Sequence, residues 1–426
     1  PVPWRALERT LSGRGPPSGG SDDGQDQAGD GNDSPAWGRR REKYARPADL
    51  PPPGHDDTGA GGRVPYAELH CHSNFSFLDG TSHPEELVEE AARLELDAIA
   101  LTDHDGMYGA ARFAEAAKEV GMRTVFGAEL SLGLAEPPAG TADPDAEHLL
   151  LLAKGADGYT SLCRAITSGQ LRGHDHEPPP GQRAEKGRPV YDLDEITDEV
   201  AGRCVVLTGC RKGSVRRALA EGGPDAATEA LLALTERFGR DDVYVELVDH
   251  GGPLDSTRND RLAEVAAELG LQTVATGAVH YARPQQAHVA QAVSAIRARR
   301  SLDEMEGWLA ASGAAHLRSG AEMHARFARY PGAVQRAALL AERYAFPLEI
   351  LAPKLPPFEV PDGRDETTHL RAVTAEGAAR RYGPREGNPE AHAQLDHELD
   401  VIERLGFPGY FLIVWDIVEF CRRNDI

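Results

Sequence analysis

The sequence has little of what marks a secreted or membrane protein. Its five cysteines form no Cys-x-x-Cys pair and no disulfide-like framework, which favours a reducing compartment. No apolar run approaches the length of a membrane span, and the run Phe411–Trp415 covers only five residues. The first residues also lack the charged-then-apolar pattern of a secretion signal. We therefore expect a cytoplasmic protein without a membrane segment.

Positive charge is also scarce. The chain has 46 Lys and Arg against 68 Asp and Glu, a net charge of −22. The acidic excess lies in residues 64–280, with 19 basic and 38 acidic residues, whereas residues 281–350 have nine basic and six acidic residues. Since binding to a phosphate backbone normally needs a basic face, residues 64–280 form a poor DNA-binding surface unless cations bridge it.

The 426 residues are enough for two or three domains. Residues 1–14 predict a short amphipathic helix, and residues 15–63, rich in Gly, Pro, Asp and Ser, predict a disordered linker. Residues 64–283 alternate strands and helices, with an inserted loop at 173–189, and residues 284–426 are mainly helical. The missing initiator Met and the helical pattern at the last residues indicate part of a longer protein.

Short apolar strands recur between helices in residues 64–283. Continuous apolar strands that alternate with helices indicate an α/β fold with a buried parallel sheet. About seven such units favour a closed or nearly closed β/α barrel, with an open doubly wound sheet as the alternative. The strands are DAIALT (97–102), TVFGAEL (124–130), HLLLLA (148–153), CVVLTG (204–209), VYVELV (243–248) and QTVATG (272–277).

Metal-ligand residue types recur at the predicted strand ends. His70 and His72 flank one residue, and on an extended strand residues two apart point to the same face. Histidine, carboxylate and thiolate ligands suit zinc, and a set with more carboxylates suits manganese or iron. Neighbouring ions of this kind can hydrolyse phosphoesters. The further candidates are His104, Glu129, His148, Cys210 and His280.

The same residues have a reading without metal, in which they form a hydrogen-bonded network at the rim of the barrel. Asp103 and Asp105 either orient the His104 imidazole or are simply turn residues. Cys71 and Cys163 are expected to be buried as small apolar residues. Further histidines are expected at the surface or in helix caps: His174, His176, His250, His316, His324 and His369.

The ordered motifs HCH…LDG, TDHDG, GAEL, EHLLLLAKGADGYTSLCRAI, LTGC and VHY resemble the PHP (polymerase and histidinol phosphatase) domain. Together with LGFPGYFLIVWDIVEFCRR, they make the chain similar to the amino-terminal part of bacterial C-family, DnaE-type DNA polymerase alpha subunits. The opening WRALERTLSGR and the segment SGAEMHARFARYPGAVQRA point to the error-prone, damage-tolerant subclass. The resemblance implies a distorted PHP-type barrel over 64–283 and the start of a polymerase palm and thumb region over 284–426.

The resemblance also implies three groups of ion ligands. Ala278 stands where metal-retaining members of the family have an Asp, so the first group lacks one carboxylate. This loss weakens the expectation of phosphoesterase or 3′-5′ exonuclease activity. A metal-stabilised structural scaffold is the non-enzymatic alternative. The implied groups are His70, His72 and Glu129; then Glu129, His148 and Cys210; then Asp79, His104 and His280.

Polymerase chemistry needs paired carboxylates that hold two magnesium ions, and residues 284–426 contain no Asp-x-Asp. In the family these aspartates lie beyond the position of Ile426, so we expect no DNA synthesis by residues 1–426 alone. The resemblance implies that the intact protein uses template-primer DNA, dNTPs and magnesium in damage-induced translesion synthesis and repair. It further implies a sliding clamp and translesion accessory proteins as partners.

Overall fold

The structure is a computed structural model of the chain, and it describes residues 44–50, 63–173, 183–310, 312–348, 357–360 and 365–424. The predicted helix at 1–14, most of the linker at 15–63 and the centre of the loop at 173–189 lie outside the described residues. The chain divides into two compact units, Pro1–Leu348 and Glu349–Ile426. None of the helices in the described ranges is long and apolar enough to cross a membrane.

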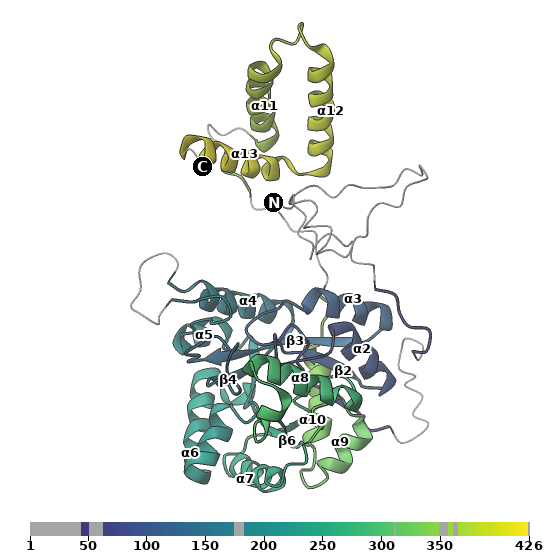
Figure 1. The fold of residues 1–426 in the computed structure, drawn as a ribbon, viewed down its shortest axis with the longest axis vertical. Coiled ribbons are helices and arrows are strands. Elements are labelled where there is room, and N and C mark those ends of the chain that lie inside the picture. Colours follow the sequence, from purple (N-terminus) through teal and green to yellow (C-terminus); the bar gives the residue numbers. More distant parts are fainter. Residues whose placement is uncertain are drawn as a thin grey trace. The chain divides into compact units, whose positions relative to one another are not determined.

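The first unit contains a seven-stranded sheet whose strands follow one another in chain order. Beyond the first and last strands, the His72 amide donates to the Val279 carbonyl and the Val279 amide to the His70 carbonyl, both at 2.8 Å. This pairing confirms the predicted nearly closed barrel. The strands are β1 (Ala67–Glu68), β2 (Ala98–Leu101), β3 (Arg123–Leu132), β4 (Glu147–Ala153), β5 (Cys204–Leu207), β6 (Val243–Val248) and β7 (Thr273–Thr276). Figure 1 shows strands β2, β3, β4 and β6 of this sheet with helices around them.

The sheet is mixed, which corrects the prediction that it is parallel throughout. Strand β4 runs antiparallel to both β3 and β5, and all other pairs are parallel. A parallel connection needs a crossover, usually a helix, but residues 133–146 are rich in Pro and Gly and contain no helix. The chain therefore returns directly beside β3.

Helices cover the outside of the barrel. Burial of their apolar faces and of strands such as β2, all four residues of which are buried, drives folding, at about 1.5–3 kcal/mol for each large aliphatic side chain. The helices that link strands are α2 (Pro84–Arg93), α3 (Ala110–Val120), α4 (Gly155–Leu171), α5 (Leu193–Val200), α6 (Ser214–Phe238), η1 (Arg240–Asp242) and α7 (Asp255–Glu268).

The first unit continues past the predicted boundary at residue 283. Helix α10 packs against β7, β1, β2 and β3, and its apolar face is buried through Val334, Ala337 and Leu340. The apolar face of α10 is buried against the strands of the barrel, so the helix belongs to the same compact unit as the barrel. The elements that follow β7 in this unit are η2 (Pro284–Gln286), α8 (Ala287–Ala298), η3 (Leu302–Met305), α9 (Gly320–Arg326) and α10 (Ala333–Tyr344).

Part of the predicted linker is also packed on the barrel. Leu50 is only 6% exposed and belongs to the hydrophobic core. The Tyr44 hydroxyl donates a hydrogen bond to Glu89 Oε1 on α2 at 3.2 Å. One apolar side chain in a Pro-rich segment can attach that segment to the barrel where the barrel has a complementary apolar surface. The composition of the segment does not show whether such a surface exists.

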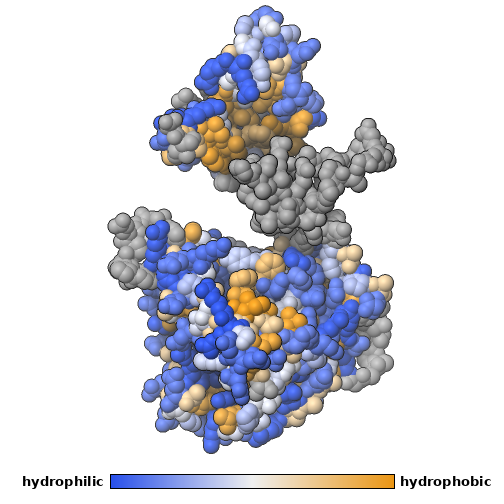
Figure 2. Space-filling view, in the orientation of Figure 1, coloured by the Kyte–Doolittle hydropathy of each residue, from blue (hydrophilic) through white to orange (hydrophobic). Residues whose placement is uncertain are grey.

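The second unit contains three helices, α11 (Glu366–Tyr382), α12 (Pro389–Leu405) and α13 (Pro408–Asn424). Its small core contains Leu370, Leu399 and Leu412. The mainly helical character predicted for this region is confirmed. Apolar side chains gather on the face of this unit along α13 (Figure 2); those at least 41% exposed include Phe411, Val414, Ile417, Val418 and Phe420.

Candidate metal centre

The two histidines that follow β1 form one wall of the site. The extended backbone from His70 to His72 directs both imidazoles to the same side, with their Nε2 atoms 3.1 Å apart. Cys71 points the other way and is fully buried in the core, as expected from alternation along a strand. Both histidines are 1% exposed, so their nitrogens face an interior site.

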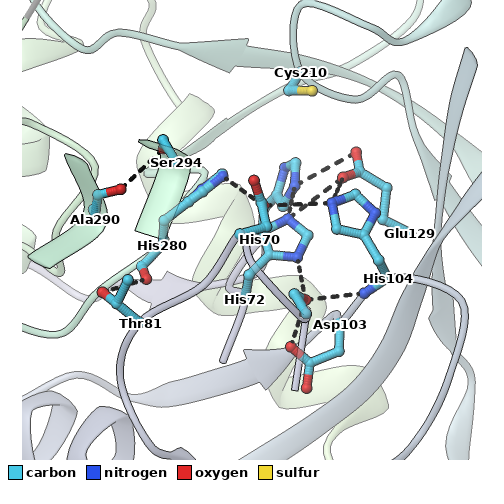
Figure 3. A network of polar contacts seen from close by, with 12 residues as sticks. His70, His72, Thr81, Asp103, His104, Glu129, Cys210, His280, Ala290 and Ser294 are labelled. Atoms are coloured by element: carbon cyan, nitrogen blue, oxygen red, sulfur yellow. Dashed lines mark hydrogen bonds and ion pairs between the residues drawn. The ribbon is translucent and has the colours of Figure 1, made fainter. Parts of the chain in front are cut away.

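Glu129, on β3, is the central acid of the site. Its Oε2 lies 3.4 Å from His72 Nε2, 3.5 Å from His104 Nε2 and 3.1 Å from His148 Nδ1, and its Oε1 lies 3.6 Å from His70 Nε2. Figure 3 shows the rings of His70, His72 and His104 facing this carboxylate. Burial raises the pKa of Glu129, but His148 and His70 hold it well below its usual value. The site therefore presents a buried negative charge.

His148 reaches this carboxylate because β4 is reversed. His148 is the second residue of β4, and in an antiparallel strand the amino end lies at the rim where the parallel strands have their carboxyl ends. Cys210, just after β5, places its Sγ 3.6 Å from His148 Nδ1. Burial lowers the pKa of His148, but Glu129 outweighs burial and raises it to about 10. The imidazole thus supplies positive charge opposite Glu129.

Asp79, His104 and His280 meet at the other side of the site. Asp79 Oδ2 lies 3.6 Å from His104 Nε2 and 3.5 Å from His280 Nε2. Burial lowers the pKa of His280 to about 3, so its imidazole is neutral, as a metal ligand must be. Neither of its ring nitrogens has a hydrogen-bond partner among the described residues.

The donor atoms form three groups that share members, each with its ligand atoms within 4.8 Å of one another. The residues fit a divalent ion, because imidazole nitrogens and carboxylate oxygens converge and some of them lack hydrogen-bond partners among the described residues. Glu129 Oε1 is buried and has no hydrogen-bond partner within the described ranges. The groups are His70, His72 and Glu129; His72, Asp79 and His104; and His104, Glu129 and His148.

Asp103 and Asp105 have different roles in the structure. Asp103 accepts hydrogen bonds at 2.7 Å from the Ser73 amide, the Ser73 hydroxyl and the Ser76 hydroxyl. Ser76 Oγ lies 3.2 Å from His72 Nδ1 and accepts from the His104 amide at 3.0 Å. Asp103 therefore acts on the imidazoles through Ser76.

Asp105 contacts no imidazole by any described hydrogen bond. It accepts from the amide and the hydroxyl of Ser131, each at 2.8 Å. Its φ of 55° shows that it occupies a turn, which is the alternative that the sequence left open. Its contacts fasten the turn after β2 to the end of β3.

Comparison with known proteins agrees with the sequence motifs. Residues 68–250 match the PHP domain, and residues 368–426 match the family described as bacterial DNA polymerase III alpha NTPase domain. The first unit contains a PHP domain. The match begins and ends within the predicted range of 64–283, and it excludes α8, α9 and α10.

The whole chain is similar to the first part of proteins named error-prone DNA polymerase. It is 50% identical to that of Nocardia farcinica, 52% to that of Mycolicibacterium paratuberculosis and 51% to that of Mycobacterium tuberculosis (strain ATCC 25618 / H37Rv). All of this chain is covered, against 39%, 37% and 36% of those proteins. The predicted resemblance is therefore confirmed, and the chain spans well under half the length of these relatives.

Ala278 lies where the resemblance implied a lost carboxylate. It is 3% exposed and has a φ of 41°, a conformation that Asp adopts more readily than Ala. With Ala at this position, the candidate first group consists of His70, His72 and Glu129, and residue 278 adds no carboxylate to it.

Sequence reasoning missed two buried acids behind His70. Glu246, on β6, places Oε1 2.8 Å from His70 Nδ1. Glu68 accepts from the His70 amide at 2.9 Å and from the Tyr66 hydroxyl at 2.7 Å, and burial raises its pKa to about 7. The signal was present for Glu246, because an acid within the apolar run VYVELV must find a partner when buried.

Proposed function

We propose that the chain is the amino-terminal portion of an error-prone, DNA-directed DNA polymerase that acts in translesion synthesis and repair. The similarity of the entire chain to three such relatives, at 50–52% identity, carries this proposal. The match of residues 368–426 to the polymerase alpha family supports it independently of the PHP domain. The substrates would be template-primer DNA and dNTPs, with magnesium at the polymerase site.

Primer extension by the parent protein tests this proposal. The parent is expected to extend a primer past an abasic site in the presence of magnesium. Residues 1–426 alone are expected to incorporate no nucleotide, since residues 284–426 contain no Asp-x-Asp. An undamaged template of the same sequence is the control for the parent. Absence of incorporation on both templates would refute the proposed polymerase activity.

We further propose that the PHP domain binds divalent ions through His70, His72, Asp79, His104, Glu129, His148, Cys210 and His280. The three groups of converging donor atoms support this role for all of them except Cys210 and His280. Those two residues are included because Cys210 Sγ lies 3.6 Å from His148 Nδ1 and His280 Nε2 lies 3.5 Å from Asp79 Oδ2. The donor set suits zinc, manganese or iron. His70, His72 and Glu129 would hold one ion, and Glu129 would be shared with a second ion near His148 and Cys210. Asp79, His104 and His280 would complete the set.

Phosphoester hydrolysis is the second candidate function of this site. Bound ions would polarise a phosphate oxygen and lower the pKa of a water molecule. Glu129 favours this function because it is ionised, buried and shared between ligand groups, whereas Ala278 disfavours it. The test is hydrolysis of bis-p-nitrophenyl phosphate by residues 1–426 with manganese. Loss of activity in His70→Ala would support the site, and equal activity in both proteins would exclude it.

If no hydrolysis occurs, metal binding would stabilise the PHP domain as a structural part of the polymerase. The sliding clamp and accessory proteins remain predictions from the resemblance, and the cytoplasmic location remains a prediction from the cysteine pattern.

A further inference from the structure

An arginine from outside the matched PHP segment reaches the candidate metal centre. Arg297, in the last turn of α8, places Nη1 2.7 Å from Asp79 Oδ1. Its side chain is 15% exposed and that of Asp79 is 26% exposed. The pair is therefore partly shielded from water, where a charge-assisted hydrogen bond is stronger than at an open surface.

This contact divides the two oxygens of Asp79 between different partners. Oδ1 accepts from Arg297, while Oδ2 faces His104 Nε2 and His280 Nε2 at 3.6 and 3.5 Å. Rotation of the carboxylate would break the bond to Arg297. The guanidinium thus leaves a single oxygen directed at the imidazoles, which suits a ligand that binds through one oxygen.

Arg297 is itself held by the backbone of two loops. Nη1 also donates to the Leu78 carbonyl, and Nη2 donates to the Ala142 carbonyl, each at 3.2 Å. The Arg297 carbonyl accepts from the Gly140 amide at 2.6 Å. The guanidinium therefore joins the loop that carries Asp79, the loop between β3 and β4, and α8.

We propose that Arg297 is a positioning residue for the metal centre: it fixes Asp79 so that Oδ2 faces the ion bound with His104 and His280. This inference rests on the proposed metal binding. It implies that α8, which lies beyond the PHP match at 68–250, completes the metal centre. A chain that keeps His280 but ends before α8 would then bind this ion more weakly than the full chain does.

Manganese titration of the full 426-residue chain tests the proposal, with binding followed by calorimetry. Arg297→Met is expected to weaken the affinity for one ion by about 10- to 100-fold, the usual effect of removing a partner that orients a ligand. Asp79→Asn is expected to weaken the same ion, and the double variant should show little further loss because the two residues act as one unit. Arg300→Met removes the same charge from an exposed position and should bind like the wild type.

A purely structural role predicts a different result. Arg297→Met would then lower the melting temperature equally with manganese and with EDTA and leave the affinity unchanged, which would overturn the proposal. Arg297→Lys keeps a charge for Asp79 but cannot reach all three acceptors. The Lys variant should therefore restore the manganese affinity more than it restores the melting temperature. It is used in place of Arg297→Met if the Met variant does not fold. If the wild type binds no ion, the metal centre itself is refuted, an outcome distinct from failure of Arg297 alone.

Discussion

Replacing Glu246 by Gln tests the buried layer behind the metal centre. Glu246 Oε1 lies 2.8 Å from His70 Nδ1, and the two side chains are 0% and 1% exposed. In the proposed ion-bound state, Nδ1 would donate a hydrogen bond to Glu246, and the lone pair of Nε2 would be free on the side of His72 and Glu129. Gln keeps the size of the side chain but removes the negative charge that makes Nε2 a stronger ligand.

The expected effect is a loss of about 10- to 100-fold in affinity for the ion at His70, equal to about 1.4–2.8 kcal/mol. The ion near Asp79 should be affected less, since Glu246 contacts His70 and Thr276 rather than Asp79. The larger change, Glu246→Ala, removes one partner of a buried pair, which costs about 3–5 kcal/mol of stability.

The measurement is a manganese titration of residues 1–426 in competition with a fluorescent chelator. Glu264→Gln is the matched control, because it makes the same chemical change at an exposed residue of α7 that pairs only with Arg261 among the contacts described. Wild-type affinity in Glu246→Gln would show that His70 does not depend on this acid, and would refute His70 as a ligand held through Nδ1.

Three further predictions concern the same site. Removal of metal with EDTA should lower the free energy of unfolding of the wild-type chain by about 2.7 kcal/mol if the ion had been present at 100 times its Kd. An unchanged melting temperature would contradict metal binding and would favour a hydrogen-bonded network without metal. Ala278→Asp should raise manganese affinity and any phosphodiester hydrolysis, with Ala278→Asn as the control that adds bulk without charge; equal effects of both variants would contradict the charge argument. In EDTA, stability should fall as pH rises above 6.5 towards 10, because the folded-state pKa of His148 is raised from 6.5 to about 10 and protonated His148 stabilises the fold below that range. Unfolding by urea at several pH values, with His148→Gln as control, checks this, and a flat profile in the wild type would contradict it.

The barrel, and the gathering of the candidate ligand residues at one site, were largely predictable because they depend on local periodicity. Alternation along a strand placed His70 and His72 on one face, and the strand–helix repeat indicated a barrel. These patterns require only that apolar residues be buried. Pairing direction is a different matter, because it depends on how the chain returns between strands. The reversal of β4 could have been inferred from the absence of a helical pattern in residues 133–146.

The helices after residue 283 show a related limit of sequence patterns. The strand–helix alternation does stop there, but α10 still packs against β7, β1, β2 and β3. A change of pattern marks the end of a repeat and carries no information about which helices pack on the finished barrel. The contact of Arg297 with Asp79 could not be predicted for the same reason, since nothing in the sequence around Arg297 indicates that it binds a loop more than 200 residues earlier in the chain.

The balance of buried charge explains why sequence alone left the metal undecided. Glu129 is ionised beside His70 and His148, and the pKa values of both imidazoles are raised, against the effect of burial, by nearby carboxylates. Protonated imidazoles and a bound cation are therefore alternative sources of the same positive charge, and both use the same residues at the same spacing. What distinguishes them is His280, whose neutral ring has no hydrogen-bond partner among the described residues. In a network without metal, these two nitrogens would need another hydrogen-bond partner, whereas in the proposed metal centre an ion beside Asp79 would be the partner of the His280 ring.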